Sequence, residues 1–368
     1  MADYSQQPTP LAFTQVPHPD PMPGAAREQA IADPRFGTVF TDHMVVVEYD
    51  EAKGGWHTAS VQPRGPIALD PAASVLHYAQ EIFEGMKAYR HPDGSLALFR
   101  PEENARRFND SARRMAMPEL PEELFLESLR QLLSVDREWV PGGDGASLYL
   151  RPFMFASEAF LGVRPARQYK FIVIASPAGA YFKSGHAAVK IWVSRDYTRA
   201  APGGTGAAKT GGNYAASLVP QAEGIARGCD QVVFLDASER RWIEELGGMN
   251  LFFVFDDGSV LTPPLGTILP GITRDSLITL LRDEGLSVRE EPYSIDQWRA
   301  DAQSGRLVET LACGTAAVVT PVGTVLDDQS EFTIGGGGMG QIAGRMRDRL
   351  TGIQTGRLPD PHGWVVTV

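Results

Sequence analysis

The chain has few cysteines and no long apolar run. Its 368 residues include two cysteines, Cys229 and Cys313, which lie far apart and outside any Cys-x-x-Cys pattern. A disulfide framework and a zinc site are therefore not expected. No stretch is apolar enough to span a bilayer, and no basic segment leads into an apolar one near Met1. We expect no membrane span and no signal peptide, which makes the cytoplasm the expected location.

Positive charge is also scarce. The chain has 34 basic and 45 acidic residues, which gives a net charge of -11. A protein that binds nucleic acid needs a basic surface, so the composition argues against that class. We interpret the arginine pairs at 106–107 and 113–114 as parts of a solvated helix face. The length suits two compact cores.

Apolar patterning predicts runs of strands separated by a few helices, which is typical of an α+β fold. A proline-rich segment, Pro8–Pro23, predicts an extended arm, and small residues over Pro177–Ala187 predict an interdomain connection. Four glycines, Gly335–Gly338, predict a flexible surface loop. We expect strands over 43–49, 95–100, 146–155, 169–177, 189–194, 231–236, 250–255 and 259–263, and helices over 101–117, 121–140 and 273–285.

One lysine, Lys209, lies in a run of small residues, APGGTGAAKTGGNYAAS. A P-loop is a weak match, because no strand directly precedes Gly203–Thr210 and Gly211 follows where a helix should begin. A solvated loop lysine is the commoner case, but it does not explain the small neighbours or the nearby Tyr214. A Schiff-base lysine needs a partly desolvated amine that a flat cofactor can approach. The other lysines are Lys53, Lys87, Lys170, Lys183 and Lys190.

A Schiff-base cofactor with a phosphate requires an anion site elsewhere in the chain. The motif LPGITRD places Gly271, Ile272 and Thr273 at the start of a predicted helix, where free N–H groups favour an anion. The motif ACGTAAV places Gly314 and Thr315 at a tight turn, a possible backbone nest. Each motif alone is also compatible with ordinary capping or turn formation.

A pyridine nitrogen would in turn require an acid. The stretch WIEELGGMNLFF offers Glu244 and Glu245 in an apolar, strand-like run. Side chains alternate along a strand, so one of the two should point inward, where a carboxylate needs a partner. The alternative is a structural ion pair with Arg240 or Arg241.

Eight stretches together resemble the branched-chain amino acid aminotransferases, pyridoxal phosphate enzymes of fold type IV. The resemblance runs from Phe36 to Pro359. It implies an α+β fold with a small N-terminal α/β domain over 36–178 and a larger pseudo-barrel domain, which binds the cofactor, over 189–368. An arm over 1–35 and an interdomain loop over 179–188 complete the chain. The matching stretches are FGTVFTDHM, LHYAQEIFEGMKAY, LFRPEENARRF, LYLRPFMF, KTGGNYAAS, EELGGMN, LPGITRDSL and CGTAAV.

The resemblance also implies a cofactor site for pyridoxal 5'-phosphate, with no metal. Lys209 would hold the cofactor as a Schiff base and move the proton between the substrate's α-carbon and the cofactor. Glu245 would pair with the ring nitrogen, and Tyr214 would bond the ring's phenolic oxygen. The phosphate would be bound by Arg107, Ile272, Thr273 and Thr315.

The substrate pocket implied by the resemblance is an apolar slot in a homodimer. It would accept leucine, isoleucine or valine in one half-reaction and glutamate in the other, by a ping-pong route. An apolar slot rejects a carboxylate, so we expect Arg151 with Tyr78 to receive the side chain of glutamate. The α-carboxylate would lie on the N–H groups of Thr315 and Ala316. The slot would be lined by Phe40, Tyr78, Phe83, Tyr149 and Arg151, with Val163 contributed by the partner subunit.

Several alternatives stay open at this point. A D-amino acid aminotransferase or an aminodeoxychorismate lyase of the same fold would keep Lys209 and Glu245 but change the pocket. A P-loop-like nucleotide-binding protein, or a cofactor-binding relative without activity, are further possibilities. Animal relatives carry a Cys-x-x-Cys pair where this chain has Ala317–Thr320, so no thiol switch of that type is expected. We expect Cys313 to be a small buried apolar residue.

Overall fold

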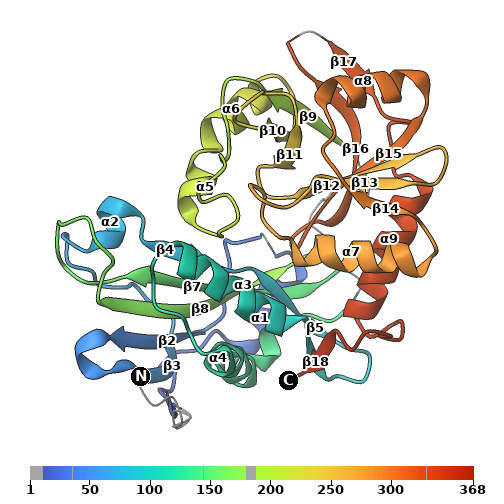
Figure 1. Ribbon diagram of the computed structural model, residues 1–368. Helices are drawn as coiled ribbons and strands as arrows, with labels where there is room; N and C mark the ends of the chain where they lie inside the picture. Colours follow the sequence, from blue (N-terminus) through green and yellow to red (C-terminus); the bar gives the residue numbers. More distant parts are fainter. Residues whose placement is uncertain (1–10, 35, 144, 180–187, 329) are drawn as a thin grey trace, which may run out of the picture. The chain divides into compact units, whose positions relative to one another are not determined.

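The computed structural model describes residues 11–34, 36–143, 145–179, 188–328 and 330–368 (Figure 1). The chain divides into two compact units. Unit 1 comprises Met1–Tyr89, Pro101–Gly179 and Val368, and unit 2 comprises Arg90–Arg100 and Ala180–Thr367. Most of the predicted interdomain connection lies outside the described residues, and the predicted domain boundaries stay predictions.

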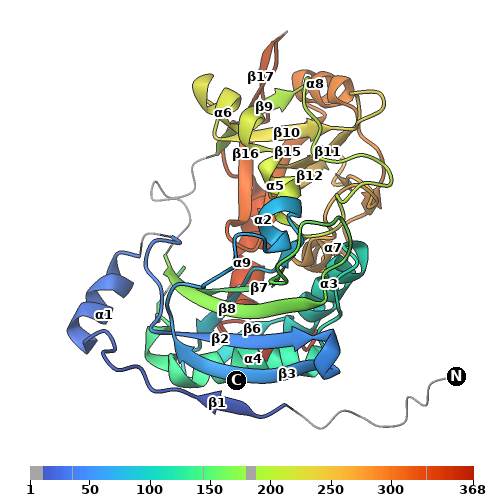
Figure 2. The same ribbon diagram turned by 90° about the vertical axis from the view of Figure 1, so that its left-hand side faces the viewer.

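Unit 1 is built on a largely antiparallel sheet with the strand order β1-β3-β2-β8-β7-β5, and β4 pairs with β7. Figure 2 shows β7, β8, β2, β3 and β1 in succession along this sheet. The predicted strands over 43–49, 146–155 and 169–177 are confirmed. The strands are β1 (Phe13–Gln15), β2 (His43–Asp50), β3 (Gly55–Pro63), β4 (Glu81–Phe83), β5 (Met86–Arg90), β7 (Ser147–Ala156) and β8 (Gln168–Ala178).

Two amphipathic helices of unit 1, α3 (Pro101–Arg114) and α4 (Glu122–Val135), bury their apolar faces. The rings of Phe108, Phe125 and Phe171 lie 5.5 to 5.8 Å apart, so α3, α4 and β8 share one aromatic core. Both helices end earlier than predicted. Ala116 adopts a left-handed φ of 52°, and a separate 3-10 turn at Arg137–Trp139 follows α4.

The described part of the predicted arm is paired rather than free. Strand β1 runs parallel to β3, with Phe13 opposite Ala59. Helix α1 (Gly24–Ala32) then follows before β2. The described residues of Pro8–Pro23 are therefore extended, as predicted, with part of them paired as a sheet edge, and α1 begins after this segment. The remaining short elements of unit 1 are a 3-10 turn at Glu51–Lys53 and helix α2 (Ser74–Tyr78).

Unit 2 is built on a mixed sheet with the order β11-β10-β9-β16-β15-β12-β13-β14, and β17 pairs with β16. Its core is apolar and aromatic, with the Phe253 ring 4.7 Å from Tyr293 and 5.2 Å from Trp298. A further antiparallel pair joins β6 and β18. The strands are β6 (Leu96–Phe99), β9 (Val189–Ser194), β10 (Gln231–Leu235), β11 (Ile243–Leu246), β12 (Asn250–Phe255), β13 (Val260–Thr262), β14 (Val288–Glu290), β15 (Leu307–Gly314), β16 (Val318–Leu326), β17 (Glu331–Thr333) and β18 (Val365–Thr367).

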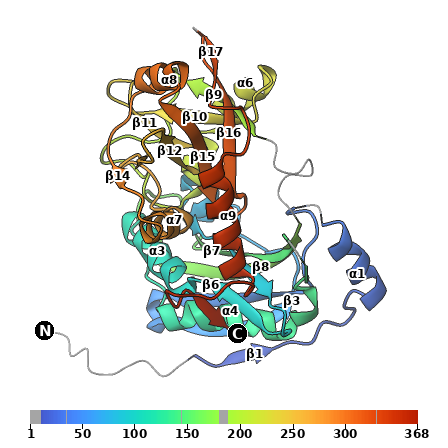
Figure 3. The same cartoon turned by 90° about the vertical axis from the view of Figure 1, so that its right-hand side faces the viewer.

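The helices of unit 2 lie against this sheet. Figure 3 shows α9 alongside β15 and β16, which it contacts. Helix α7 ends before Gly285, which adopts a left-handed φ of 79°, as expected for a helix stop. The part of the chain that the structure describes has no helix long and apolar enough to cross a membrane. The helices are α5 (Gly211–Ala215), α6 (Leu218–Ala226), α7 (Ile272–Asp283), α8 (Ile295–Ser304) and α9 (Gln341–Gln354).

Three turns of unit 2 place the predicted motifs. The hairpin at Asp256–Gly258 is confirmed, since β12 and β13 pair with Val254 opposite Val260. The predicted tight turn at Thr315 joins β15 to β16. The glycines of Gly335–Gly338 form a largely exposed turn, with φ values of 51° and 72° at Gly335 and Gly337.

Candidate functional site

Lys209 lies at the end of a loop of small residues in unit 2. Its Nζ donates a hydrogen bond of 2.9 Å to the hydroxyl of Tyr214, and both side chains are half-buried. The loop is closely packed: a Cβ at Gly206 would lie 1.9 Å from the carbonyl oxygen of Thr267. Glycine is therefore required there. The structure confirms that Tyr214 reaches Lys209.

Asn213, which the sequence analysis missed, fixes the shape of this loop. Its amide donates to the carbonyls of Thr205 and Ala208, both at 2.8 Å, and its Oδ1 accepts from the Thr205 hydroxyl. Asn213 is buried and satisfies loop carbonyls that would otherwise need water. The loop therefore presents Lys209 in one conformation.

The region around Lys209 differs from a P-loop in a way the sequence only partly predicted. Strand β9 ends at Ser194, so no strand directly precedes Gly203. The expectation that no helix starts after Lys209 is wrong, because α5 begins at Gly211. That helix is a single short turn of five residues. Its first two residues are glycines, which have no side chain and so constrain the backbone little.

Glu245 is a buried carboxylate with three donors around it. Arg199 Nη1 and the backbone N–H of Leu269 lie 2.8 and 2.9 Å from its Oε1. The amide of Asn250 lies 3.4 Å from its Oε2. The alternative pairing with Arg240 or Arg241 is wrong, because Arg240 donates to the Arg195 carbonyl and Arg241 lies over the Trp242 ring.

Burial shifts the titration of Glu245. It raises the pKa of this carboxyl to about 7, although Arg199, the Leu269 N–H and the charge of Lys209 all act to lower it. Because the charge of Lys209 is felt at Glu245, the lysine and the carboxylate lie in one electrostatic environment. A group with this pKa can change its protonation near neutral pH.

The raised pKa predicts a pH-dependent stability. The folded state holds the Glu245 proton more tightly than the unfolded chain, so its contribution is fully present below pH 4.5 and is lost as pH rises through about 7. Between pH 4.5 and pH 7, the free energy of unfolding of the parent should fall further than that of the cofactor-free Glu245→Gln variant. The difference should reach up to about 3 kcal/mol. Urea unfolding at pH 4.5, 6 and 8 measures this difference, and parallel curves for the two proteins would contradict it.

Glu244 is buried as well, so the expectation that only one of the two glutamates points inward is wrong. Glu244 is 7% exposed and Glu245 is 2% exposed. The side chains of β11 still alternate, but both faces of this strand are covered: Thr267 bonds Glu244 on one side, and Arg199 pairs with Glu245 on the other.

The four motifs of unit 2 converge on this region. A Cβ at Gly248 would lie 3.8 Å from the Tyr214 ring, and one at Gly314 would lie 3.5 Å from the Gly248 carbonyl oxygen. The Asn250 amide donates to the Leu269 carbonyl at 3.1 Å, just ahead of α7. The loop between β11 and β12 therefore connects Tyr214 with the Gly314 turn, while Asn250 connects Glu245 with the start of α7.

The start of α7 agrees with the helix start predicted from the motif LPGITRD to within one residue. Gly271 is its N-cap, and no side chain caps it. A Cβ at Gly271 would lie 2.0 Å from Asn250 Oδ1, so only glycine fits. Thr273 is the second residue of α7, and Thr315 directly follows the end of β15 at Gly314. The N–H groups of this helix end and two hydroxyls can therefore receive an anion.

Arg107 lies on α3 in unit 1 and is buried against Glu84, so the interpretation of a solvated helix face is wrong for this arginine. Its Nε and Nη2 each donate to Glu84 at 2.8 Å, which makes a bidentate pair. Glu84 also accepts from the amide of Asn104 at 2.8 Å and is fully buried. Glu84 and Asn104, which the sequence analysis missed, hold the guanidinium of Arg107 in one orientation.

A second cluster in unit 1 contains three of the predicted pocket residues. Arg151 Nη2 donates to the hydroxyl of Tyr149 at 3.0 Å, and its guanidinium lies 4.8 Å from the centre of the Phe83 ring. Phe36 packs edge-on against Tyr149 with the ring centres 5.1 Å apart. A Cβ at Gly85 would lie 2.0 Å from the Tyr149 hydroxyl, so the cluster needs glycine there.

The other predicted pocket residues have different contacts or exposures. The hydroxyl of Tyr78 donates to the Leu161 carbonyl at 2.5 Å, so in unit 1 Arg151 contacts Tyr149 rather than Tyr78. The Phe40 ring lies 5.0 Å from the Arg64 guanidinium. Val163 is 84% exposed, and Ala316 is half-buried in the β15–β16 turn.

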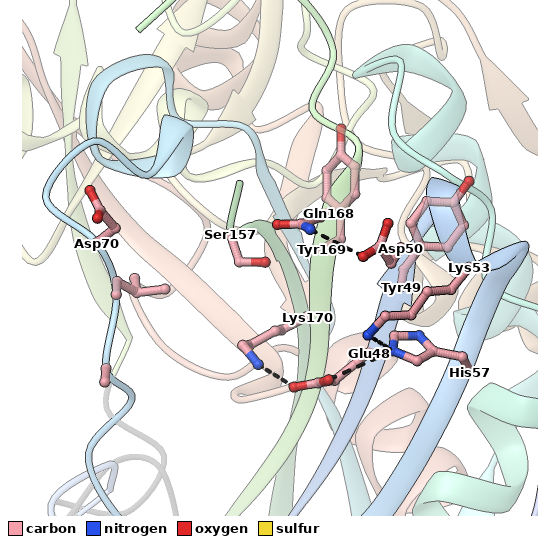
Figure 4. Close-up of a pocket in the computed structure, with 12 residues that line it drawn as sticks. Glu48, Tyr49, Asp50, Lys53, His57, Asp70, Ser157, Gln168, Tyr169 and Lys170 are labelled. Atoms are coloured by element: carbon pink, nitrogen blue, oxygen red, sulfur yellow. Dashed lines mark hydrogen bonds and ion pairs between the residues drawn. The ribbon is translucent and has the colours of Figure 1, made fainter. Parts of the chain in front are cut away.

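A cavity of about 240 Å³ in unit 1 contains none of the predicted site residues. Figure 4 shows Lys170 turned toward Glu48, and Lys53 turned toward His57, whose Nε2 lies 3.1 Å from Lys53 Nζ. The two lysines of the cavity, Lys53 and Lys170, are therefore engaged by other residues that line it. The geometry therefore does not place the predicted chemistry in this cavity.

The cysteines behave as expected from the sequence. Cys229 and Cys313 are both buried and free. Burial raises the pKa of the Cys313 thiol to about 12, so it stays protonated and acts as a small apolar residue. Among the described residues, no group of acidic, histidine or cysteine side chains is arranged to hold a metal ion.

Comparison with known proteins decides the family. The family model described as "Amino-transferase class IV" matches residues 81–325. The branched-chain-amino-acid aminotransferase of Mycolicibacterium smegmatis is 57% identical over 361 residues, which cover 97% of this chain and 98% of that protein. The chain belongs to the class IV aminotransferases, among the branched-chain-amino-acid aminotransferases. The fold type IV architecture predicted from the sequence is thereby confirmed.

Solved structures agree with this membership. The Escherichia coli branched-chain amino acid aminotransferase gives a TM-score of 0.70 at 31% identity, with 81% of this chain and 93% of that chain covered. A second branched-chain amino acid aminotransferase, complexed with N-(5'-phosphopyridoxyl)-L-glutamate, gives 0.70 at 29% identity, covering 87% and 97%. Aminotransferases of this class depend on pyridoxal phosphate. The P-loop interpretation of Lys209 is therefore excluded.

Proposed function

We propose that this aminotransferase exchanges the amino group of leucine, isoleucine or valine with 2-oxoglutarate, using pyridoxal 5'-phosphate held by Lys209. The observation that carries the proposal is the arrangement in unit 2. The amine of Lys209 bonds the Tyr214 hydroxyl at 2.9 Å, in the field of a buried carboxylate, Glu245. The high identity to branched-chain relatives supports the substrate class.

The residues of unit 2 fit this cofactor. A protonated ring nitrogen needs a buried acid that can be ionised at neutral pH, and Glu245 has a pKa of about 7. A phosphate needs donors without competing acceptors, and the uncapped start of α7 supplies N–H groups beside the Thr273 hydroxyl. The bound cofactor would supply an electron sink for the carbanion formed at the substrate's α-carbon.

Each residue has a separate task in this proposal. Lys209 would take the proton from the substrate's α-carbon and deliver it to the cofactor carbon on the other side of the substrate nitrogen, so its amine must be neutral before the transfer. Tyr214 orients that amine and donates to an oxygen on the cofactor ring. Glu245 keeps the ring nitrogen charged, and Arg199 holds Glu245 in place from behind.

The resemblance assigns the phosphate to Arg107, Ile272, Thr273 and Thr315. Arg107 contributes charge from α3 in unit 1, where Glu84 fixes its orientation. Unit 2 contributes Ile272, Thr273 and Thr315 from the start of α7 and the β15–β16 turn. Glu84 offsets part of the charge of Arg107, so backbone dipoles must share the task of neutralising a phosphate dianion.

The substrate pocket would be formed by the Arg151 cluster and the remaining predicted residues. An arginine over an aromatic ring can offer its apolar face to leucine and its N–H edge to a carboxylate. The hydroxyl of Tyr149 holds Arg151 in unit 1 and could orient it for the side chain of glutamate. Phe40, Tyr78 and Phe83 would line the slot, with Val163 from a partner subunit, and the N–H groups of Thr315 and Ala316 would bind the α-carboxylate.

The role of Arg151 predicts a split between substrates. We expect Arg151→Met to raise KM for 2-oxoglutarate by about 10- to 100-fold, because a lost charge-assisted bond costs about 1.5–3 kcal/mol. The KM for leucine should change less than about threefold, since methionine keeps an apolar contact. Tyr149→Phe, which removes one hydroxyl, should also raise KM for 2-oxoglutarate relative to KM for leucine, but by a smaller factor. Equal changes for both substrates would show that Arg151 supports the fold rather than selecting the substrate.

A substrate panel tests the proposed function as a whole. Purified protein supplied with pyridoxal phosphate is assayed in three reactions. Two contain 2-oxoglutarate together with either L-leucine or D-alanine, and the third contains aminodeoxychorismate. We expect turnover with L-leucine only. Preference for D-alanine or aminodeoxychorismate would replace the branched-chain function by one of its relatives with the same fold. Assembly as a homodimer and location in the cytoplasm stay predictions.

A further inference from the structure

We propose that unit 2 carries a second ligand site, a cavity beside Glu244 that binds an organic cation with a short apolar stem. The cavity has a volume of about 480 Å³. None of its lining residues is basic, and two of them are acidic. It is lined by Pro202, Gly203, Asp236, Trp242, Ile243, Glu244, Pro263, Pro264, Leu265, Gly266, Thr267 and Pro292.

Glu244 is the group that points to a cation. Glu244 lines the cavity although the residue is only 7% exposed. In the described chain it takes part in one hydrogen bond, from the Thr267 hydroxyl to Oε1, and in no ion pair. A buried carboxylate is costly without a cation partner. Its Oε2 is therefore an acceptor that a ligand can use.

The second acid of the cavity is already occupied. Asp236 accepts four backbone N–H bonds of 2.7 to 3.0 Å, which close the turn between β10 and β11. These bonds lower its pKa and use its oxygens. Asp236 adds negative potential, and Glu244 alone can form a short contact with a ligand.

The walls select for an apolar stem. Four prolines and Leu265 line the cavity, and Leu265 is 50% exposed although it is apolar. The indole of Trp242, which already contacts the Arg241 guanidinium at 4.8 Å, adds aromatic surface to the cavity wall. An ammonium ion lacks the stem, an alcohol lacks the charge, and a carboxylate is repelled. An alkylguanidinium or alkylammonium satisfies both requirements.

The site is coupled to the acid of the proposed cofactor site. Glu244 and Glu245 are neighbours on β11, and the charge of Glu244 acts to raise the pKa of Glu245. A cation on Glu244 offsets that charge and so favours ionised Glu245. Linkage is reciprocal, so ionised Glu245 also favours the bound cation. This coupling rests on the proposed function, whereas the binding itself does not.

Calorimetric titration of the holoenzyme with n-butylguanidinium tests the binding. This probe does not condense with an aldehyde, so it leaves the cofactor intact. We expect saturable binding at one site per chain, and none for guanidinium or n-butanol at matched ionic strength and concentration. Glu244→Gln should weaken binding at least 10-fold, and Glu331→Gln, which removes an exposed charge outside the cavity, should not.

A second variant separates binding from folding. Leu265→Ala changes an exposed loop residue, so the fold should persist, and we expect it to weaken n-butylguanidinium binding at least threefold. Absence of saturable binding, or equal binding by the parent and Glu244→Gln, would overturn the site. Bound n-butylguanidinium should also move the pH titration of the cofactor's visible absorption to lower pH. Binding without that shift would overturn the coupling, whereas a protein with no visible absorption would overturn the proposed function instead.

Discussion

Replacing Lys209 by alanine is expected to lower the rate of transamination by about 10⁴-fold, the upper range for loss of a proton-transferring side chain. The loop of small residues should keep its shape in this variant. Its carbonyls at Thr205 and Ala208 accept from the Asn213 amide, which the substitution does not change. Single-turnover measurements with leucine separate the chemical step from product release. Cofactor affinity, measured by dialysis, should fall as well.

The matched control is Lys190→Ala. Lys190 is a half-buried lysine on β9 that pairs with the exposed Glu331, so its loss removes a partly exposed ion pair of little energetic value. We expect the control to retain the parent's rate within a factor of two. A Lys209→Ala variant that still turns over leucine at the parent's rate would remove this residue from the chemistry.

The second large effect is expected at Arg199. Arg199→Gln leaves Glu245 buried without its cation, and breaking one side of a buried ion pair costs about 3–5 kcal/mol. We expect this loss in the free energy of unfolding of the cofactor-free protein at pH 8, measured with urea. At pH 5 the loss should be smaller, because burial and removal of the arginine both favour the protonated, uncharged carboxyl.

A double variant makes this prediction sharper. Arg199→Gln combined with Glu245→Gln removes both charges and should recover most of the stability that the single variant loses. Arg241→Gln, at an exposed arginine that was the sequence-based alternative, should change stability by less than about 0.5 kcal/mol. If the double variant were no more stable than Arg199→Gln alone, the pair with Glu245 would not be the reason for the loss.

The regular elements could be predicted from local patterning. The apolar runs around Val45, Leu150 and Val173 form the central strands of unit 1, and the spacing of Phe108 and Ala112 gives α3. Helix ends were harder, because a left-handed residue such as Ala116 is not marked by glycine. The start of α7 was predicted to within one residue from the motif LPGITRD.

The partners of the site residues could not be predicted from the sequence. Arg240 and Arg241 are nearer to Glu245 along the chain than Arg199, and all three have the same charge. Only the folded loop brings the Arg199 guanidinium within 2.8 Å of the carboxylate. Glu84 beside Arg107 and Asn250 beside Glu245 are similar cases, since such contacts depend on how distant elements pack. The signal that could have suggested them is a polar side chain placed within an apolar run.

The most direct test of the account is the identity of the lysine that holds the cofactor. The holoenzyme is reduced with sodium borohydride, which fixes the cofactor to its lysine, and the labelled peptide is identified by mass spectrometry. We predict a single label on Lys209, in the stretch TGAAKTGGNY. A label on another lysine, for example Lys87 or Lys190, or no label on a protein supplied with pyridoxal phosphate, would contradict the account.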